Sequence, residues 1–316
     1  MLQMKTAGFK ALDNLRSTGH FPASWQGLGD LEEKVDNFVA RFLIERFKVS
    51  KELGGGFLLP ELLDSALRTS EKENMDELNV PEKEKLELVE ALDRQNSMMQ
   101  LYPRYISLLL PWIHEVAERE KREVKILELA SGSGGLALAL AEELNKKKLP
   151  VCITGSDIVP AFIEKGNELA EKNKLPLIFR HLDAFNLNQL GEEKFDLVLI
   201  SQSLHHFTPG QLAVIIAQSA EHCTTAFIGI DGYRSILLAC GVPLVSSLQG
   251  IGSFTMDGMT SARKFYSELE LDIISEIATG KKNHAVYCSW PLSVLTVRFD
   301  HKKSNFNPSI PQQHNL

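Results

Sequence analysis

The sequence has few cysteines, and none of them form a cluster. Its 316 residues include four, Cys152, Cys223, Cys240 and Cys288, with no CxxC pair and no His/Cys spacing typical of metal ligands. Disulfide frameworks belong mainly to small secreted domains, whereas scattered thiols stay reduced inside the cell. We therefore expect free thiols, a cytoplasmic location and no bound metal.

Long hydrophobic runs and an excess of basic residues are also missing. The N-terminal stretch MLQMKTAGFKALDNL lacks the apolar core of a signal peptide. The longest apolar run, YISLLLPWI, is too short to cross a bilayer, so no membrane span is expected. A formal net charge of −7 argues against nucleic acid as a partner. The expected partner is a small molecule, and the sequence leaves a homodimer open.

The first third of the chain has the periodicity of helices. In residues 30–48 apolar side chains recur every three or four positions, which predicts an amphipathic helix beginning near Asp30. The pattern resumes in FLLPELLDSALRTSE, the polar residues 70–80 predict an exposed connection, and further helices follow Pro81 and Pro103. We expect residues 1–105 to form a helical region that covers the carboxyl edge of a following sheet and helps to close a substrate pocket.

Short apolar runs alternate with helical stretches from Val124 onward. The runs VKILELA, VCITGSD, LIFRHLD, FDLVLIS and TAFIGID predict strands, and this alternation is typical of a parallel sheet covered on both faces. TSARKFYSELE then predicts a helix, and LDIISEIA and PLSVLTVRFD predict two closing strands. The expected fold is α/β, with a mostly parallel seven-stranded sheet and helices on both faces in residues 106–301. A flexible tail is expected in residues 302–316.

The segment ILELASGSGG joins the first of these strands to a helix through a glycine-rich turn. Glycines permit a tight turn and close approach of a ligand, and the first turn of a helix offers unpaired N–H groups. Open α/β sheets bind ligands at such carboxyl ends of strands. Taken alone, the turn also fits a purely structural role or the looser dinucleotide pattern GxGxxA, formed by Gly132, Gly134 and Ala137.

The letters ELASGSG resemble the first motif of class I S-adenosylmethionine-dependent methyltransferases, written E/D-x-G-x-G-x-G. Glu128, Gly132 and Gly134 match this motif, and Ala130 stands where its first glycine usually is. The resemblance implies a Rossmann-like fold, S-adenosylmethionine as the cofactor and S-adenosylhomocysteine as the product. It also implies that Glu128 organises the loop and approaches the methionine amino group.

Three further strand ends extend the resemblance. Asp157, followed by Ile158, ends the second strand, where the acid of the family accepts both ribose hydroxyls. Asp183 follows the third strand and resembles the acid that faces the adenine amino group, with Ala184 adding a backbone contact. Ser201 closes FDLVLIS, which resembles the fourth-strand motif beside the sulfonium and the acceptor. A single acid at a strand end is more often a turn former, so the interpretation depends on the ordered set.

The acceptor side is marked by fewer residues. His205 and His206 follow the fourth strand. One of them could remove a proton from an acceptor hydroxyl, and the position of His205 is the one that relatives favour. The alternative is that both histidines only pack. Tyr102 and Tyr105 are candidate pocket residues in a stretch that otherwise predicts core. Arg234 either binds an acidic acceptor or, as the simpler interpretation, pairs with a neighbouring carboxylate.

The pattern as a whole predicts a methyltransferase that uses S-adenosylmethionine to methylate a small organic acceptor, with oxygen favoured as the methylated atom. The apolar insertion 232–259 lies where related enzymes carry a substrate cap. One alternative is an NAD(P)-dependent oxidoreductase, which explains the glycines and Asp157 but not Glu128 or Asp183. The other is a methyltransferase-like binding protein without catalysis. In-line transfer from a sulfonium chiefly needs positioning of the reactants, and no metal is expected to take part.

Overall fold

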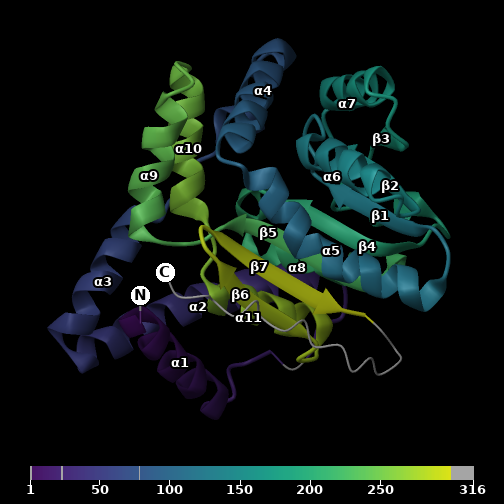
Figure 1. Ribbon diagram of the computed structural model, residues 1–316. Coiled ribbons are helices and arrows are strands. Elements are labelled where there is room, and N and C mark those ends of the chain that lie inside the picture. The colour runs from purple at the N-terminus through teal and green to yellow at the C-terminus, as the bar shows by residue number, and fades with distance from the viewer. Residues whose placement is uncertain (1, 23, 78, 300–316) are drawn as a thin grey trace.

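A seven-stranded sheet forms the centre of the computed structural model, which describes residues 2–22, 24–77 and 79–299 (Figure 1). Its strand order is β3-β2-β1-β4-β5-β7-β6, in which β1 to β5 run parallel to one another and β7 pairs antiparallel with both β5 and β6. The strands are β1 (Val124–Leu129), β2 (Val151–Asp157), β3 (Leu177–His181), β4 (Phe195–Ser201), β5 (Cys223–Gly232), β6 (His284–Ser289) and β7 (Leu292–Arg298). This topology confirms the predicted Rossmann-like sheet. The tail predicted for residues 302–316 lies outside the described residues.

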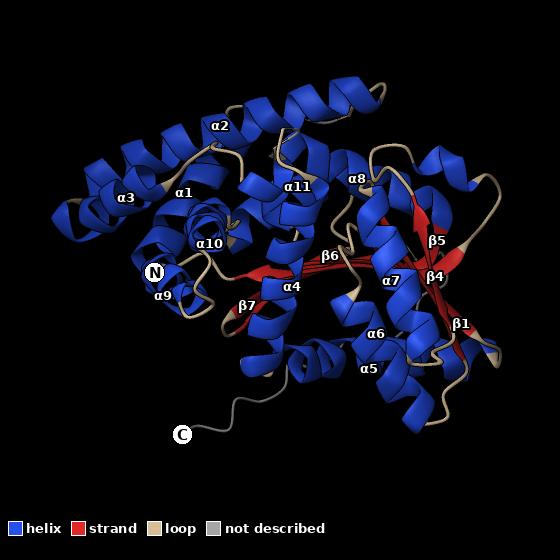
Figure 2. Cartoon of the chain, turned by 90° about the horizontal axis from the view of Figure 1, so that it is seen from above, coloured by secondary structure: helices blue, strands red, loops and turns tan. Residues whose placement is uncertain are grey.

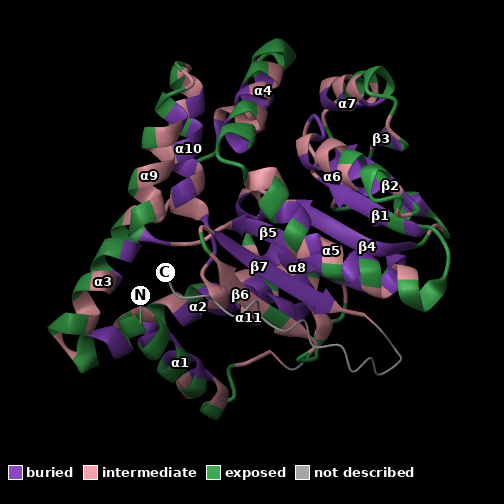
Figure 3. Cartoon of the chain, viewed as in Figure 1, coloured by how far each residue is buried: buried purple, intermediate pink, exposed green. Residues whose placement is uncertain are grey.

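Helices cover both faces of this sheet (Figure 2). Along β1 the side chains alternate: Ile126 packs with the helices of one face, and Leu127 with those of the other. Both residues are fully buried, as are most residues of the central strands (Figure 3). The first face carries α5 (Leu101–Glu120), α6 (Gly135–Lys146) and α7 (Pro160–Lys172), and the second carries α8 (Pro209–His222) and α11 (Glu268–Thr279).

The N-terminal helices form an additional layer outside α8 and α11. They are α1 (Leu2–Ser17), α2 (Leu28–Leu53) and α3 (Gly55–Leu67). The buried face of α2, which includes Phe38 and Phe42, belongs to the same core as α8 and α11. The backbones of α2 and α8 come so close that a Cβ at Gly210 would overlap the carbonyl of Glu32.

The prediction that the N-terminal helices cover the carboxyl edge of the sheet is therefore wrong for α1 to α3. These helices lie over one face of the sheet and bury apolar side chains there. The elements that reach the carboxyl edge are the short 3₁₀-helix η1 (Asn74–Asp76) and α4 (Glu82–Met98). Residues 70–80, expected to be an exposed connection, also differ from the prediction, because Glu73 is only 2% exposed.

The segment LDIISEIA, predicted as a strand, is part of α11. Ser267 and Glu270 form a capping box that starts this helix. The helix is apolar on most sides because it lies between the sheet and α2, and a short run of this kind cannot be distinguished from a strand by periodicity. The predicted helix TSARKFYSELE is broken, since α10 ends at Lys264 and α11 begins at Glu268.

The insertion after β5 folds into two helices, α9 (Ile236–Ser247) and α10 (Gly252–Lys264), which pack against each other. The second of these also contacts α4, η1 and the 3₁₀-helix η3 (Leu204–His206). A further 3₁₀-helix, η2 (Leu187–Leu190), follows β3. None of the helices in the described part of the chain is both long and apolar enough to span a membrane.

The ring of Phe179 on β3 sits against three glycines from different elements. A Cβ at Gly134 before α6, at Gly155 on β2 or at Gly166 on α7 would overlap this ring. Gly134 additionally has a φ of 86°, a left-handed conformation that favours glycine. Because these three positions carry no side chain, the Phe179 ring of β3 packs against β2, α7 and the glycine loop at the same time.

We expect Gly155→Ala to lower the free energy of unfolding by about 1–3 kcal/mol, because the new methyl group overpacks against the Phe179 ring. Urea denaturation measures this change. Gly56→Ala, at an open position on α3, should be neutral or slightly stabilising. Phe179→Leu should recover part of the loss in the Gly155→Ala background, and additive effects of the two changes would contradict the proposed contact.

Candidate functional site

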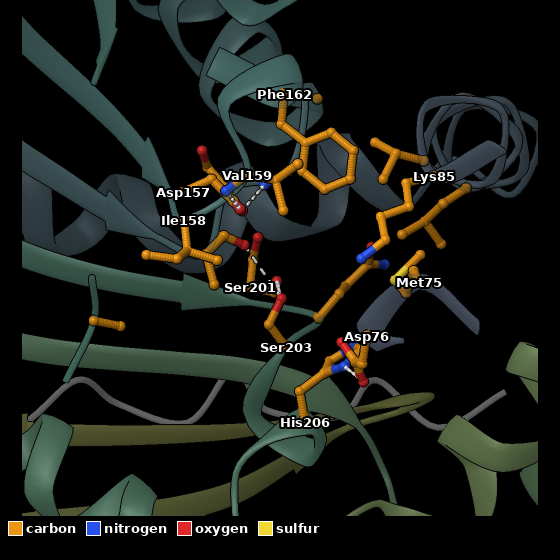
Figure 4. Close-up of a pocket in the computed structure, with 18 of the residues that line it drawn as sticks. Met75, Asp76, Lys85, Asp157, Ile158, Val159, Phe162, Ser201, Ser203 and His206 are labelled. Carbon is orange, nitrogen blue, oxygen red and sulfur yellow. Dashed lines mark hydrogen bonds and ion pairs between the residues drawn. The ribbon is translucent and has the colours of Figure 1, made fainter. Parts of the chain in front are cut away.

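A cavity of about 650 Å³ opens at the carboxyl ends of β1, β2 and β4 (Figure 4). It is lined by the glycine loop after β1, by residues 157–160 and 182–185 after β2 and β3, and by the loop after β4. Residues of η1 and α4 form the opposite wall. Its size lies within the range of small-molecule and cofactor sites. No residue of α9 or α10 is among the described residues that line this cavity.

The glycine loop owes its shape to three left-handed residues. Ala130, Gly132 and Gly134 have φ values of 50°, 54° and 86°. The first position therefore needs the conformation that glycine adopts without cost, and alanine adopts it at about 1–2 kcal/mol. The loop leads directly into α6, which begins at Gly135. Ala130 and Gly132 line the cavity, whereas Gly134 faces Phe179.

The carboxylate of Asp157 fastens this loop to the end of β2. Its two oxygens accept hydrogen bonds from the backbone N–H groups of Gly132, at 2.9 Å, and Val159, at 3.0 Å. Asp157 is only 8% exposed, and its burial raises its pKa. The carboxylate is thus enclosed by the loop that it holds. The neighbouring Ile158 is 55% exposed at the cavity wall.

The segment after β3 supplies the next stretch of wall. Asp183 and Ala184 both line the cavity. The Oδ1 atom of Asp183 accepts a hydrogen bond from the Phe185 N–H at 2.9 Å, so this acid also forms a turn. The structure brings Asp157, Asp183 and the glycine loop together around one space, as the order of strand ends in the sequence predicted.

Glu128 lies beneath the loop rather than in the cavity wall. It is 2% exposed, and its Oε1 accepts a hydrogen bond from the Ser201 hydroxyl at 2.7 Å. Burial raises the pKa of Glu128 to about 7, and the nearby carboxylates of Asp93 and Asp157 add to this effect. Ser201 itself lines the cavity and so connects Glu128 to it.

Asp93 on α4 is an acid of the cavity that sequence reasoning missed. It accepts hydrogen bonds from the hydroxyls of Tyr102, at 2.5 Å, and Ser133, at 2.9 Å, and burial raises its pKa. Tyr102 also lines the cavity. No local pattern marks Asp93, because its partners belong to other segments and its own helix has many acids.

Tyr105 lies outside the cavity wall, with 1% of its surface exposed. Its hydroxyl accepts a hydrogen bond from the side-chain amide of Gln202, which also exchanges two hydrogen bonds with Asn96. Gln202 has a left-handed φ of 56° and does line the cavity. Strained backbone of this kind is characteristic of functional sites. Tyr105 therefore helps to hold Gln202 in place and does not itself border the cavity.

The two histidines after β4 occupy different environments. His206 lines the cavity, and its Nδ1 donates to Asp76 at 2.8 Å (Figure 4). His205 is outside the lining, where its Nδ1 donates to Asp231 at 2.8 Å and its Nε2 faces Glu73. Burial opposes protonation of His205, but the carboxylates of Asp231 and Glu73 outweigh burial and raise its pKa to about 10. The sequence favoured His205 as the residue facing the acceptor, whereas in the structure it is His206 that lines the cavity.

Arg234 is likewise away from this cavity. Its Nε donates to Asp64 at 2.6 Å, and its Nη1 donates to the carbonyls of Arg263 and Phe265. The same Asp64 contacts Arg46 at 2.7 Å. Through these contacts the guanidinium of Arg234 connects α3, the end of β5 and α10. This agrees with the simpler interpretation of the sequence, in which Arg234 pairs with a neighbouring carboxylate.

Comparison with known proteins adds two findings. Residues 126–225 match the family model described as a methyltransferase domain. Among solved structures, the chain resembles the plantazolicin methyltransferase BpumL in complex with SAH, with a TM-score of 0.52 and 12% sequence identity over 75% of this chain and 95% of that chain. A complex of BpumL with a monoazolic desmethylPZN analog and SAH gives a TM-score of 0.52 and 13% identity over 68% and 90% of the two chains. At such identity the likeness shows the fold alone. No curated protein matches the sequence.

The raised pKa of Glu128 predicts a specific dependence of stability on pH. A carboxyl whose pKa is about 7 when folded and about 4.3 when unfolded binds more protons in the folded state, so the contribution of Glu128 to stability is fully present below pH 4 and is lost as pH rises through 7. Between pH 5 and pH 8 the free energy of unfolding should fall relative to Glu128→Gln by an amount on the order of 3 kcal/mol. Urea denaturation at several pH values tests this, with the exposed Glu142→Gln as the control. Parallel curves for wild type and Glu128→Gln would contradict a buried, neutral Glu128.

Proposed function

We propose that the cavity binds S-adenosylmethionine and that the protein transfers its methyl group to a small organic acceptor, with oxygen favoured, and the match of residues 126–225 to a methyltransferase domain supports this. The observation that carries this proposal is the charge of the cavity wall. Its titratable side chains are mostly acids, and Lys85 and His206 are the basic side chains that accompany them among the described lining residues. The acids are Asp76, Glu82, Asp93, Asp157 and Asp183.

An acidic wall favours a cationic nucleoside over an anionic one. S-adenosylmethionine carries a sulfonium and an ammonium against one carboxylate, so its net charge is positive. NAD(P) carries a pyrophosphate, which Asp93 would repel across a partly desolvated space. This argument favours methyl transfer over the oxidoreductase alternative.

The proposed placement of the cofactor follows the strand ends. Asp157 retains free lone pairs for the ribose hydroxyls, because an ionised carboxylate accepts about four hydrogen bonds and the structure gives it two from Gly132 and Val159. Asp183 and Ala184 would contact the adenine. The methionine end would lie near Ser201, with Glu128 acting through that hydroxyl. Ala130, Gly132 and Gly134 shape the loop that lets the backbone approach.

The acceptor would enter from the side of His206 and Asp76, opposite the adenine end (Figure 4). We propose that residues 1–105 form a helical region on the substrate side, and η1 and α4 are the elements of it that border this side of the cavity. The chain chiefly has to hold the acceptor atom in line with the sulfonium and exclude water. The Nε2 of His206 is the nitrogen that we propose as the proton acceptor for an acceptor hydroxyl.

We expect Asp157→Ala to weaken S-adenosylhomocysteine binding by at least about tenfold, because the ribose loses a charge-assisted acceptor and the loop loses its anchor. Asp183→Ala should have a smaller effect. Isothermal calorimetry measures both, with the half-exposed Asp272→Ala as the control. Thermal protection of wild type by NADH, with none by S-adenosylhomocysteine, would instead favour the oxidoreductase. Binding with no transfer to any acceptor would favour a non-catalytic role.

His206→Ala should lower the rate of methyl transfer by about 10²–10⁴-fold while leaving S-adenosylhomocysteine affinity nearly unchanged. His205→Ala should instead destabilise the fold, because it leaves Asp231 buried without its cationic partner. Turnover with labelled cofactor and a metabolite extract, followed by thermal denaturation of both variants, separates the two effects. A His206→Ala protein with full turnover would reduce this residue to a packing role.

A further inference from the structure

Glu73 lies between the side chains of His205 and His206. Its Oε1 is 3.3 Å from His205 Nε2, and its Oε2 is 3.7 Å from His206 Nε2. One ligand-type atom from each residue falls within 4.8 Å of the others. Two ligands of a tetrahedral ion with bonds of about 2.1 Å are about 3.4 Å apart, so these separations suit a coordination site.

A second carboxylate orients each imidazole. His205 Nδ1 donates to Asp231 Oδ2 at 2.8 Å, and His206 Nδ1 donates to Asp76 Oδ2 at 2.8 Å. With Nδ1 of each ring engaged by a carboxylate, Nε2 of each ring points toward Glu73. Metal-binding histidines almost always have such an outer carboxylate or carbonyl, which fixes the tautomer and the ring orientation.

Two of the atoms that face one another are buried and lack a hydrogen-bond partner within the described chain. They are Oε1 of Glu73 and Nε2 of His205, on side chains that are 2% and 5% exposed. Buried polar atoms are nearly always satisfied by a hydrogen bond, an ordered water or an ion. An ion shared by this oxygen and this nitrogen would satisfy both.

The cluster also brings three carboxylates close together. Those of Glu73, Asp76 and Asp231 lie around the two imidazoles, and the ammonium of Lys264 is 3.5 Å from Glu73 Oε1. A divalent cation among these carboxylates would gain from their negative charge.

We propose that Glu73, His205 and His206 bind a divalent transition-metal ion. Two imidazoles and a carboxylate suit Zn²⁺ or Co²⁺ rather than Mg²⁺ or Ca²⁺, which prefer oxygen ligands. The ion would join the segment before α4 to the loop after β4 and so hold η1 against the cavity. His/Cys spacing in the sequence gave no sign of this site, because Glu73 is distant in the chain from the histidines.

The site can be tested apart from methyl transfer. An ion on His206 Nε2 occupies the nitrogen proposed above as a proton acceptor, so loading the site should suppress turnover that depends on that imidazole. Metal affinity is measured without any acceptor or cofactor. Failure of the metal site and failure of the proposed methyltransferase activity are therefore distinguishable.

Full-length protein is stripped with a chelator and titrated with Zn²⁺ by calorimetry and with Co²⁺ by visible absorption. We expect one equivalent to bind, a tetrahedral Co²⁺ spectrum and a higher Tm in the loaded protein. Glu73→Gln should weaken binding by more than about 100-fold, and the outer-carboxylate variant Asp76→Asn by about 10–100-fold. His284→Asn is the matched control, since His284 faces the single carboxylate of Asp272 at 2.9 Å, and it should bind the ion as wild type does.

Two results would overturn the site. One is wild-type affinity for Zn²⁺ and Co²⁺ no higher than that of Glu73→Gln, which would mean that protons neutralise the cluster. The other is an equal loss in His284→Asn, which would place binding elsewhere. If Glu73→Gln does not fold, undiminished affinity in Asp76→Asn, whose carboxylate is partly exposed, and in His206→Asn has the same meaning.

Discussion

The parallel sheet is apolar on both faces, and the need to cover it determines how the rest of the chain is arranged. Ile126 and Leu127 point to opposite faces and are both fully buried. The helices that cover one face, α8 and α11, are themselves apolar on most sides, with buried residues such as Ile215 and Ile274. Because that leaves apolar surface on their outer sides, α1 and α2 add a further layer, with Phe42 at its centre. Covering the sheet thus uses α1 to α3, while η1, α4 and the start of α5 border the cavity.

The cavity concentrates carboxyl groups that the fold holds in place with its own donors. Asp157 accepts from two backbone N–H groups, Glu128 from Ser201, and Asp93 from Tyr102 and Ser133. Burial raises the pKa of all three acids. Donors already in place mean that the carboxylates need little rearrangement when a cationic ligand arrives, which lowers the entropic cost of binding.

The parts that sequence predicted well are those specified by neighbouring residues. Strand ends, the glycine loop and Asp157 follow one another in short motifs, and these set the sheet and the cofactor side of the cavity. The parts it could not predict depend on distant packing. Asp93 and Glu73 reach the site from segments that precede the first strand, and LDIISEIA becomes a helix because a second layer covers its outer side.

The acidic wall has a consequence for turnover in the proposed reaction. Methyl transfer removes the charge of the sulfonium, so S-adenosylhomocysteine carries one positive charge fewer than S-adenosylmethionine. A cavity bordered by Asp93 and Asp157 holds the cation more strongly than its neutral product, because the attraction of the acids is lost while the burial of the nucleoside is unchanged. The charges that favour entry of the cofactor would thereby also promote release of the product, which limits product inhibition without any moving part of the chain.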